Sequence, residues 1–418
     1  MQVGVIHAYP NEELLVSLSG YVVHLFVPEK DAGAMADQFS KYHHVTVHAV
    51  YFEESNETIN KITEIAKKHQ ITCFLPLYEG GIIMSSLVSL ALKLPFYSLS
   101  SAVTSRNKYY LKLLMQSAFL ATPESVPVFP YTPYQDVRSV LGERIVLKVV
   151  DSMNSQAVIV VDCEKEYQQY LHQVFHYLNH ESPESAVDRN RFCYGRDHVK
   201  VIAQEFCDGV EVNLDVLVRA GQVTLLGIFE KARTKGPFFP ESMSFYPSTL
   251  TNEQQNQITE TAKKAVQVMQ ISNGVAHIEI RYKEGKPKLL DMGLRPGGAF
   301  TIKAIKELYS VDLVAEIAKL MTGEGEPAMI TEPGDLAVLY GGIIFPQSGQ
   351  ISGIEGFDKL VIADLKELRV LVKEGSRIVA PPFSAQPHLC YYYLQGDDPK
   401  RLYKEHCLIQ QQIKFQIE

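Results

Sequence analysis

The stretch that decides the fold is His277-Ile-Glu-Ile-Arg-Tyr-Lys-Glu-Gly285-Lys-Pro-Lys-Leu-Leu-Asp291-Met-Gly-Leu-Arg295-Pro-Gly-Gly298. Two short runs with alternating side chains flank Gly285, which predicts two strands joined by a turn. One face of the first strand carries Val275, His277, Glu279 and Arg281. One face of the second carries Leu289, Asp291 and Gly293. The stretch therefore predicts a hairpin with a polar face.

A loop with an odd number of residues centred on Gly285 places Glu279 directly across from Asp291, with Cβ atoms roughly 5 Å apart. Like charges in this position repel unless a cation lies between them, and Mg²⁺ prefers oxygen ligands while it keeps phosphate oxygens and water. Arg295 follows, just before two glycines. The pattern indicates a metal-binding nucleotide site. The alternative is an exposed hairpin with scattered charge.

Length and composition place the chain among multidomain globular proteins. With 418 residues, the chain is long enough for about three domains. A hydrophobic fraction of 46% and a charged fraction of 21% are ordinary values for a fully folded protein. The net charge of -8 and the absence of a Lys/Arg block argue against a nucleic-acid surface.

The sequence favours a cytoplasmic protein without a membrane span. The N-terminus lacks a basic region followed by an apolar run, so it predicts a first strand rather than a signal peptide. The most apolar segment, residues 82–99, is interrupted by serines, Lys93 and Pro95, and we interpret it as a buried helix and strand. Six cysteines without a CxxC pair suit reduced thiols and predict no zinc site.

Residues 1–104 are expected to form a parallel α/β domain. Strands are predicted at 3–7, 21–27, 45–51 and 71–75, with a helix at 57–69. Ligands gather beyond the carboxyl ends of strands in such sheets, so the turn Pro76-Leu-Tyr-Glu-Gly-Gly81 is a candidate substrate edge. A plain strand-to-helix turn is an equally open interpretation.

Residues 105–325 are expected to form a second domain, which includes a small subdomain at about 120–205. The stretch Ser105-Arg106-Asn107-Lys108 is predicted to open a helix that runs to about Ala118, and a strand at 144–150 carries Lys148. The loop 151–157 consists of small polar residues that let backbone N–H groups approach an anion, although a plain turn explains it as well.

Further along this domain, three histidines recur at every fourth position: His172, His176 and His180. A solvated stripe is favoured over a metal site, because no carboxylate or cysteine completes a ligand set. Strands at 199–206, 211–218 and 223–229 predict an antiparallel meander. The middle strand carries on one face Glu211, Asn213 and Asp215. That face could be solvated or could bind a ligand.

Two more helices and a final lobe complete the chain. An amphipathic helix is predicted at 252–270, with Ile258, Ala262, Ala265, Val266 and Met269 inward, and another helix at 302–321. A Gly-, Glu- and Pro-rich linker at 323–333 leads to a mainly β lobe at 326–418. Strands of this lobe are predicted at 337–345, 359–363 and 390–394.

The order of these segments resembles the ATP-grasp superfamily of carboxylate-amine ligases, and within it the L-amino acid ligases. The resemblance rests on residues 105–108, 146–148, 204–211, 241–250 and 279–298. It implies an α/β and α+β fold: an N-terminal parallel domain, a central ATP-grasp domain and the C-terminal lobe. It also implies two cofactors, ATP and Mg²⁺ or Mn²⁺.

Residue roles follow from the resemblance. Lys108 and Lys148 would contact ATP phosphates or adenine, backbone groups of Glu205 and Cys207 would bind adenine, and Glu211 would bind the ribose.

Further roles concern the metal and the substrates. Glu279 and Asp291 would hold the metal, Arg295 would bind the substrate carboxylate as the catalytic group, and Glu241 would bind the first amino acid's ammonium. Ser155 is the expected donor of the phosphate loop, which lacks the usual glycines.

Two positions depart from the family pattern, which usually has Glu at Asp291 and Asn at Gly293. We therefore expect weakened metal binding. The small Ala299, just past the glycines, suggests a roomy pocket for the first substrate.

The implied reaction starts when ATP phosphorylates a carboxylate to an acyl phosphate, and an amine then attacks to give an amide, ADP and phosphate. The implied partners are small-molecule amino acids, and the sequence neither requires nor excludes a homodimer. Two alternatives stay open: an ATP-grasp ligase for another carboxylate and amine, and an ATP-binding protein that has lost catalysis.

Overall fold

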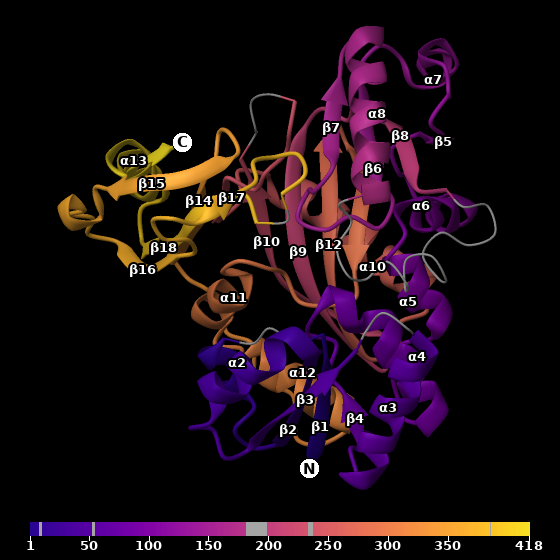
Figure 1. Cartoon of the computed structure of the whole chain (residues 1–418), viewed down its shortest axis with the longest axis vertical. Coiled ribbons are helices and arrows are strands. Elements are labelled where there is room, and N and C mark those ends of the chain that lie inside the picture. The colour runs from indigo at the N-terminus through magenta and orange to yellow at the C-terminus, as the bar shows by residue number, and fades with distance from the viewer. Residues whose placement is uncertain (8–10, 52–54, 181–198, 233–236, 385) are drawn as a thin grey trace.

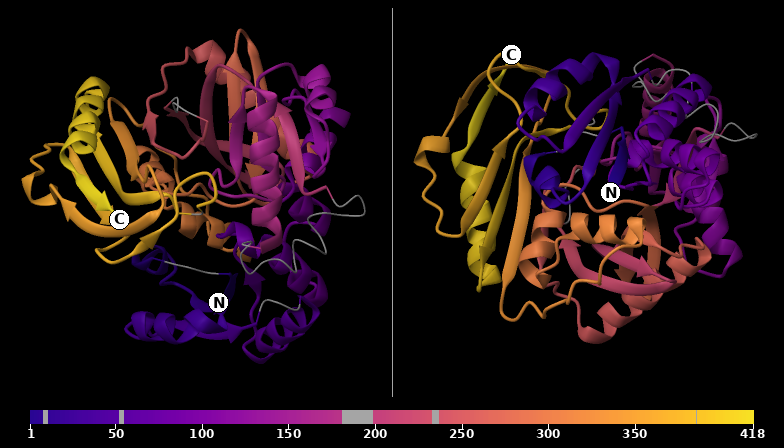
Figure 2. Two further views of the ribbon diagram at one scale, coloured as in Figure 1. Left: turned by 45° about the horizontal axis from the view of Figure 1, so that its top comes forward. Right: turned by 90° about the horizontal axis from the view of Figure 1, so that it is seen from below.

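The computed structural model describes residues 1–7, 11–51, 55–180, 199–232, 237–384 and 386–418. Strands within these ranges form four sheets (Figures 1 and 2). None of the helices in the same ranges combines the length and the apolar content that crossing a membrane requires.

The N-terminal sheet has the order β3-β2-β1-β4 and is parallel throughout, as predicted. Its strands are β1 (Gln2–Ile6), β2 (Val22–Pro28), β3 (Val45–Val50) and β4 (Cys73–Phe74). Its helices are α1 (Glu12–Ser17), α2 (Glu29–Phe39), α3 (Ser55–Lys68) and α4 (Ile82–Leu92). The strand predicted near residue 95 is wrong, because Lys93 ends α4 in a left-handed conformation and Ser98 caps the next helix, α5 (Leu99–Ser105).

The small antiparallel sheet has the order β5-β8-β6-β7 and lies at the upper right of Figure 1. Its strands are β5 (Ser125–Val128), β6 (Ile145–Val149), β7 (Val158–Val161) and β8 (Val201–Glu205). It packs against α7 (Tyr134–Leu141) and α8 (Glu164–His180). His172 and His176 of α8 are exposed, which confirms a solvated stripe for these two residues, whereas the His180 side chain lies outside the described part.

The large antiparallel sheet has the order β13-β12-β9-β10-β11-β14-β18-β16. Its first five strands along the chain are β9 (Val210–Arg219), β10 (Gln222–Lys231), β11 (Met243–Tyr246), β12 (Gly274–Lys283) and β13 (Lys286–Gly293). The predicted meander is wrong for its first strand. β8 pairs with β5 on one edge and with β6 on the other, so the turn at residues 207–209 leads into another sheet. Of the three predicted strands, the last two, β9 and β10, form a hairpin.

Helices cover both faces of the large sheet. α6 (Lys108–Ser117) follows the cap Asn107, so it begins at the end of the stretch 105–108 that was predicted to open it. α10 (Asn252–Val268) buries the predicted apolar face against β9, β12 and β13. The helix predicted at 302–321 is two helices, α11 (Thr301–Tyr309) and α12 (Leu313–Thr322). Ser310 adopts φ 57° and Asp312 caps α12, which separates them.

The C-terminal lobe continues the large sheet with β14 (Ala337–Ile344), β16 (Leu365–Val370) and β18 (His388–Gly396). A third small sheet combines β15 (Gly349–Glu355), β17 (Arg377–Ile378) and β19 (Lys414–Ile417). The strand predicted at 359–363 is wrong, because residues 357–359 form a 3-10 turn and the strand starts at 365. α13 (Pro399–Gln412) was not predicted, although Asp398 caps it and Pro399 opens it.

β12 lies near one edge of the large sheet and connects the core to the candidate site. Ala276, Ile278 and Ile280 face α10 in the core, whereas His277 and Glu279 point to the opposite face. Because its side chains alternate, β12 contributes both to the hydrophobic core and to the candidate site.

Tyr97 fixes the start of β12 against the N-terminal part of the chain. Its hydroxyl accepts a hydrogen bond from Val275 N at 2.8 Å and donates one to Val275 O at 2.8 Å. Both groups are buried, so no water would replace a lost partner.

We expect Tyr97→Phe to lower the free energy of unfolding by about 1–3 kcal/mol, because it leaves a buried N–H and a buried carbonyl without partners. Urea unfolding at pH 7 measures this change. The control is Tyr131→Phe, since Tyr131 is 95% exposed. Equal free energies of unfolding for the two variants would contradict a stabilising role of the Tyr97 hydrogen bonds.

Candidate active site

A cavity of about 350 Å³ lies between the large sheet, the small sheet and the turn at Glu79. Residues from segments far apart in the sequence line it. They include all ten predicted site residues: Lys108, Lys148, Ser155, Glu205, Cys207, Glu211, Glu241, Glu279, Asp291 and Arg295. The structure thus brings these side chains together, and their individual roles stay predictions.

Polar residues on this face of the large sheet form cross-strand rows over β9, β12 and β13. The rows are Glu211 with Arg281; Asn213 with Glu279 and Asp291; and Asp215 with His277 and Gly293. Asn213 and Asp215 are 2% and 0% exposed, so the solvated polar face considered for β9 is wrong. The face is an interior polar surface.

Glu279 and Asp291 pair directly across β12 and β13, as predicted, but the loop differs from the prediction. The turn has two residues, Glu284 and Gly285, both with positive φ, which is typical of a tight hairpin turn. This turn alone would set the register one residue off. A β-bulge at Leu290 restores the facing pair.

The bulge also corrects one predicted orientation. Leu289 was expected on the face of Asp291, yet it is 2% exposed and belongs to the core beside α10. Leu290, the extra residue, lines the cavity together with Asp291. A bulge therefore builds one wall of the site.

Lys231, at the end of β10, is the cation that sequence reasoning missed. Its Nζ lies 2.6 Å from Glu279 Oε1 and 3.4 Å from Glu211 Oε1. Burial alone would lower the pKa of Lys231, but Glu279 and then Glu211 raise it above its ordinary value. Burial would conversely raise the pKa of Glu279, and Lys231 outweighs it, so the pKa of this carboxyl is lowered. Lys231 and Glu279 thus stabilise each other's charged form.

A second ion pair joins Asp291 to Lys108 at the start of α6. Lys108 Nζ lies 2.8 Å from Asp291 Oδ2 and donates to Ser152 O at 2.8 Å. Burial opposes the charge of Lys108, but Asp291 and Glu79 raise its pKa. Lys148 is different, since burial and then Lys108 lower its pKa. Nearby carboxylates therefore compensate the charge of Lys148 less than they compensate that of Lys108.

The donor set fits a divalent cation with oxygen ligands. Glu279 and Asp291 face each other, and carboxylate oxygens are what Mg²⁺ prefers. Gly293 provides no amide, and a side chain there would lie 3.7 Å from Arg295. Within the described ranges, no group of three or more His, Cys, Asp or Glu side chains is arranged around a common metal position.

Residues 205–207 form the hinge between the small and large sheets, and salt bridges fix it. Arg281 Nη1 donates to Cys207 O at 2.6 Å, while its Nε and Nη2 donate to Glu211 at 3.0 and 2.5 Å. Lys288 pairs with Glu205, whose carboxylate also accepts from Glu124 N at 3.1 Å. Glu211, the predicted ribose ligand, is therefore already bound by two cations.

The predicted phosphate loop has left-handed backbone conformations without glycine. Asn154, Ser155 and Ala157 have φ of 50°, 55° and 54°. Such angles are uncommon outside glycine, so the surrounding structure has to hold them. Ala157 N donates to Pro382 O at 2.6 Å, and Gln156 Nε2 donates to Phe383 O at 2.8 Å, which ties this loop to the C-terminal lobe.

Glu79 bridges two arginines and is a site residue that the predicted substrate edge contained without naming it. Arg295 Nε and Nη2 donate to Glu79 Oε2 at 3.0 and 2.7 Å, and Arg106 binds the other oxygen. Burial would raise the pKa of Glu79, but Arg295 and Arg106 lower it to about 2. The strand-to-helix turn thus orients Arg295. The signal in the sequence was an acidic residue beside two glycines.

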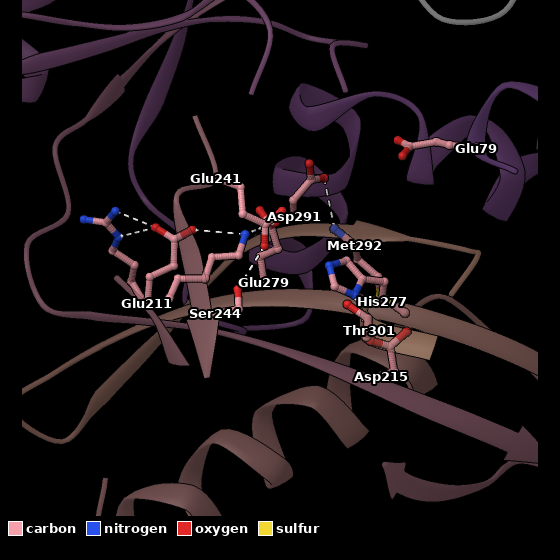
Figure 3. Close-up of polar contacts among 12 residues, drawn as sticks. Glu79, Glu211, Asp215, Glu241, Ser244, His277, Glu279, Asp291, Met292 and Thr301 are labelled. Atoms are coloured by element: carbon pink, nitrogen blue, oxygen red, sulfur yellow. Dashed lines mark hydrogen bonds and ion pairs between the residues drawn. The ribbon is translucent and has the colours of Figure 1, made fainter. Parts of the chain in front are cut away.

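Asp215 organises the loop after β13. Its Oδ1 accepts from Gly297 N at 2.7 Å. Its Oδ2 binds Nδ1 of His277 at 3.0 Å, and these two residues are labelled in Figure 3. A Cβ on Gly297 would lie 2.9 Å from His277 Nδ1 and 2.8 Å from Thr301 Cγ2, so glycine is required for this close approach.

Glu241 lies where the β10–β11 connection meets the C-terminal lobe. Ser244 Oγ donates to its Oε1 at 3.0 Å, and His388 Nε2 donates to its backbone carbonyl at 2.7 Å. Tyr391 also lines the cavity and bonds His388 Nδ1 at 3.0 Å. Sequence reasoning missed His388 and Tyr391, because nothing in their spacing indicates a contact 147 residues from Glu241.

We expect Glu79→Gln to lower the free energy of unfolding at pH 7 by about 3 kcal/mol, since two buried guanidinium groups lose their counter-charge. Because the pKa of Glu79 in the folded state is lowered from 4.5 to about 2, its contribution is present above pH 4.5 and is lost as the pH falls towards 2. The difference between wild type and variant should shrink over that range.

Urea unfolding between pH 7 and pH 3 provides the measurement. Glu143→Gln is the control, because Glu143 forms an ion pair with Arg138 on the surface, with side chains 76% and 42% exposed. A difference that stays constant with pH would argue against the ion pair as the source of stability.

Comparison with known proteins shows which families and structures this chain resembles. Residues 141–302 match the ATP-grasp domain family. Carnosine synthase 1 from Mus musculus is 28% identical over 142 residues, which are 34% of this chain and 17% of that protein. The chain thus spans only a small part of this relative.

Solved structures are similar over the whole chain. The L-amino acid ligase from Bacillus licheniformis superposes with a TM-score of 0.84 at 20% identity, covering 100% of this chain and 98% of that one. Phosphoribosylglycinamide synthetase from Anaerococcus prevotii gives 0.67 at 13% identity, covering 100% and 99%. Residues 141–302 are therefore similar to the ATP-grasp domain, and the whole chain shares the fold of these solved structures.

Proposed function

We propose that this protein is an ATP-dependent ligase that joins two L-amino acids into a dipeptide through an acyl phosphate and releases ADP and phosphate. One observation carries the proposal: a single cavity holds the Arg295 guanidinium, the facing Glu279 and Asp291, and the ammonium groups of Lys108 and Lys148. Phosphoryl transfer to a carboxylate needs this combination, because negative charge spreads over phosphate and carboxylate oxygens.

ATP would bind between the two antiparallel sheets. Backbone groups of Glu205 and Cys207 would hold the adenine at the hinge, and Glu211 would bind the ribose. Lys148 suits a phosphate contact. Burial lowers its pKa, and a nearby anion would compensate its buried positive charge. Ser155 adds a hydroxyl on the same side of the cavity.

The amino-acid end of the cavity would lie near Arg295 and Glu241. Glu79 holds the guanidinium in place with two hydrogen bonds, which fixes its orientation before the substrate binds. A guanidinium binds a carboxylate through two parallel hydrogen bonds and stabilises the charge on a tetrahedral intermediate. Glu241 offers an acceptor for the ammonium group of an amino acid.

Glu279 and Asp291 would hold Mg²⁺, or Mn²⁺ in its place. A metal held there would supply positive charge that stabilises the negative charge developing during phosphoryl transfer. Both carboxylates have protein cations as partners, so Lys231 and Lys108 have to shift towards phosphate oxygens when the nucleotide enters. The shorter Asp291 and the missing amide at Gly293 lead us to expect weak metal binding.

Two other functions use the same residues. A ligase for another carboxylate and amine needs the same ATP site. An ATP-binding protein without catalysis is the second, and the pairing of Glu279 and Asp291 with lysines favours it. ADP release across pairs of the twenty L-amino acids, with products identified by mass, separates these functions.

We expect ADP release to require an amino acid and to yield a dipeptide mass. Arg295→Ala should lower the rate at least about 100-fold, because the charge on the tetrahedral intermediate loses its counter-charge. Arg295→Lys keeps a partner for Glu79 but loses the fork geometry, so it should fold normally and stay slow. Tight ATP binding without ADP release for any pair would indicate another carboxylate or a protein without catalysis.

We expect Glu279→Gln to raise the Mg²⁺ concentration for half-maximal ADP release at least about tenfold, because it removes one of two carboxylate ligands. A titration of MgCl₂ at fixed ATP measures this shift. Glu284→Gln in the exposed turn of the same hairpin is the matched control and should leave the titration unchanged. Coincident curves for both variants would place the metal elsewhere.

A further inference from the structure

The C-terminal lobe contributes a wall to the cavity that none of the predicted roles uses. Its residues are Gln386, Pro387, His388 and Tyr391, from the start of β18 and the segment before it. His388 is 3% exposed, whereas Tyr391 is partly exposed. Tyr391 is therefore the member of this wall that offers a ring surface to a ligand.

A β-bulge creates this wall. Positions 388 and 391 of a regular strand would lie on opposite faces. In β18, the register with β14 shifts by one residue at Leu389, which points into the core at 0% exposure. His388 and Tyr391 consequently share the cavity face, and their rings lie 4.6 Å apart.

Close packing locks His388 against the loop that carries Glu241. A Cβ on Gly342 of β14 would lie 2.5 Å from His388 Cδ2. The absence of a side chain at Gly342 therefore leaves the space that the imidazole ring occupies. His388 Nε2 donates to Glu241 O at 2.7 Å, which leaves Nδ1 to accept from the Tyr391 hydroxyl at 3.0 Å. His388 thereby links Tyr391 to the backbone of Glu241, and the side chain proposed to bind the ammonium group lines the same cavity.

The wall is uncharged. Burial lowers the pKa of His388, so the imidazole is neutral at pH 7. Burial also raises the pKa of Tyr391 to about 12. Ala299 and Gly298 line the cavity as well and add little bulk. A substrate side chain that reaches this wall meets a ring face and apolar atoms, which favour large neutral side chains over charged ones.

We propose that Tyr391, positioned by His388, selects the amino acid whose ammonium group binds Glu241, and that it favours large uncharged side chains such as aromatic rings. This inference rests on the proposed ligase function. Tyr391 acts by direct contact with the substrate side chain, whereas His388 is a positioning residue.

The experiment compares kcat/KM for L-phenylalanine and L-alanine, each paired with a fixed second amino acid, in wild type and variants. Tyr391→Ala should lower the Phe/Ala ratio about tenfold by removing the ring contact. Tyr391→Phe keeps the ring and should stay within about twofold of wild type. Tyr391→Leu fills the space without a ring and guards against a folding defect in the alanine variant.

Several readouts separate selection from a structural role. KM for the large amino acid should rise in Tyr391→Ala, while KM for ATP stays unchanged. Calorimetric titration of L-phenylalanine into protein with a non-hydrolysable ATP analogue should show the same loss of affinity. Tyr403→Ala, a 54% exposed tyrosine of α13 in the same lobe, is the control and should leave the ratio unchanged.

An unchanged Phe/Ala ratio in both Tyr391→Ala and Tyr391→Leu overturns the inference and leaves the ligase function standing. The same holds if Tyr403→Ala changes the ratio equally. A wild-type protein that releases no ADP with any amino acid, yet binds ATP, overturns the ligase function and this inference with it.

Discussion

The structure depends on the pairing of partly buried charges on the cavity face of the large sheet and beside it. A carboxylate removed from water is costly unless a cation or several N–H donors compensate it. Glu279 forms an ion pair with Lys231, and Asp291 forms one with Lys108. Glu79 forms ion pairs with Arg295 and Arg106. In the proposed reaction Lys231 and Lys108 exchange their carboxylate partners for phosphate oxygens, whereas Glu79 keeps Arg295 in place. The same ion pairs that stabilise the protein would then prepare it for a polyanionic substrate.

Three parts of the chain that are distant in sequence complete one cavity. The N-terminal turn supplies Glu79, which orients Arg295 from the loop after β13. The C-terminal lobe supplies His388 and Tyr391, which meet Glu241 from the central part. The small sheet is joined to the same lobe through Ala157 and Pro382. The cavity exists only when all of these parts are folded together.

One extra residue in a strand shapes each of two cavity walls. Leu290 restores the facing of Glu279 and Asp291, and Leu389 turns His388 and Tyr391 to the same side. With regular alternation, Glu279 would not face Asp291, and His388 and Tyr391 would lie on opposite faces of β18. Bulges next to a site re-aim side chains in this way without changing the sheet around them.

The sequence by itself determined the N-terminal parallel sheet, the amphipathic helix α10 and the β12–β13 hairpin, because these follow from local periodicity and from short loops. The resemblance to ATP-grasp ligases assigned roles to ten residues, all of which line one cavity. Tertiary structure alone decided the ion-pair partners Lys231 and Glu79, the place of β8 in a separate sheet, and the contribution of His388 and Tyr391. Partners of this kind lie tens to hundreds of residues apart, and a bulge changes a face without any local signal. Only the packed chain, which must neutralise each buried charge, fixes these contacts.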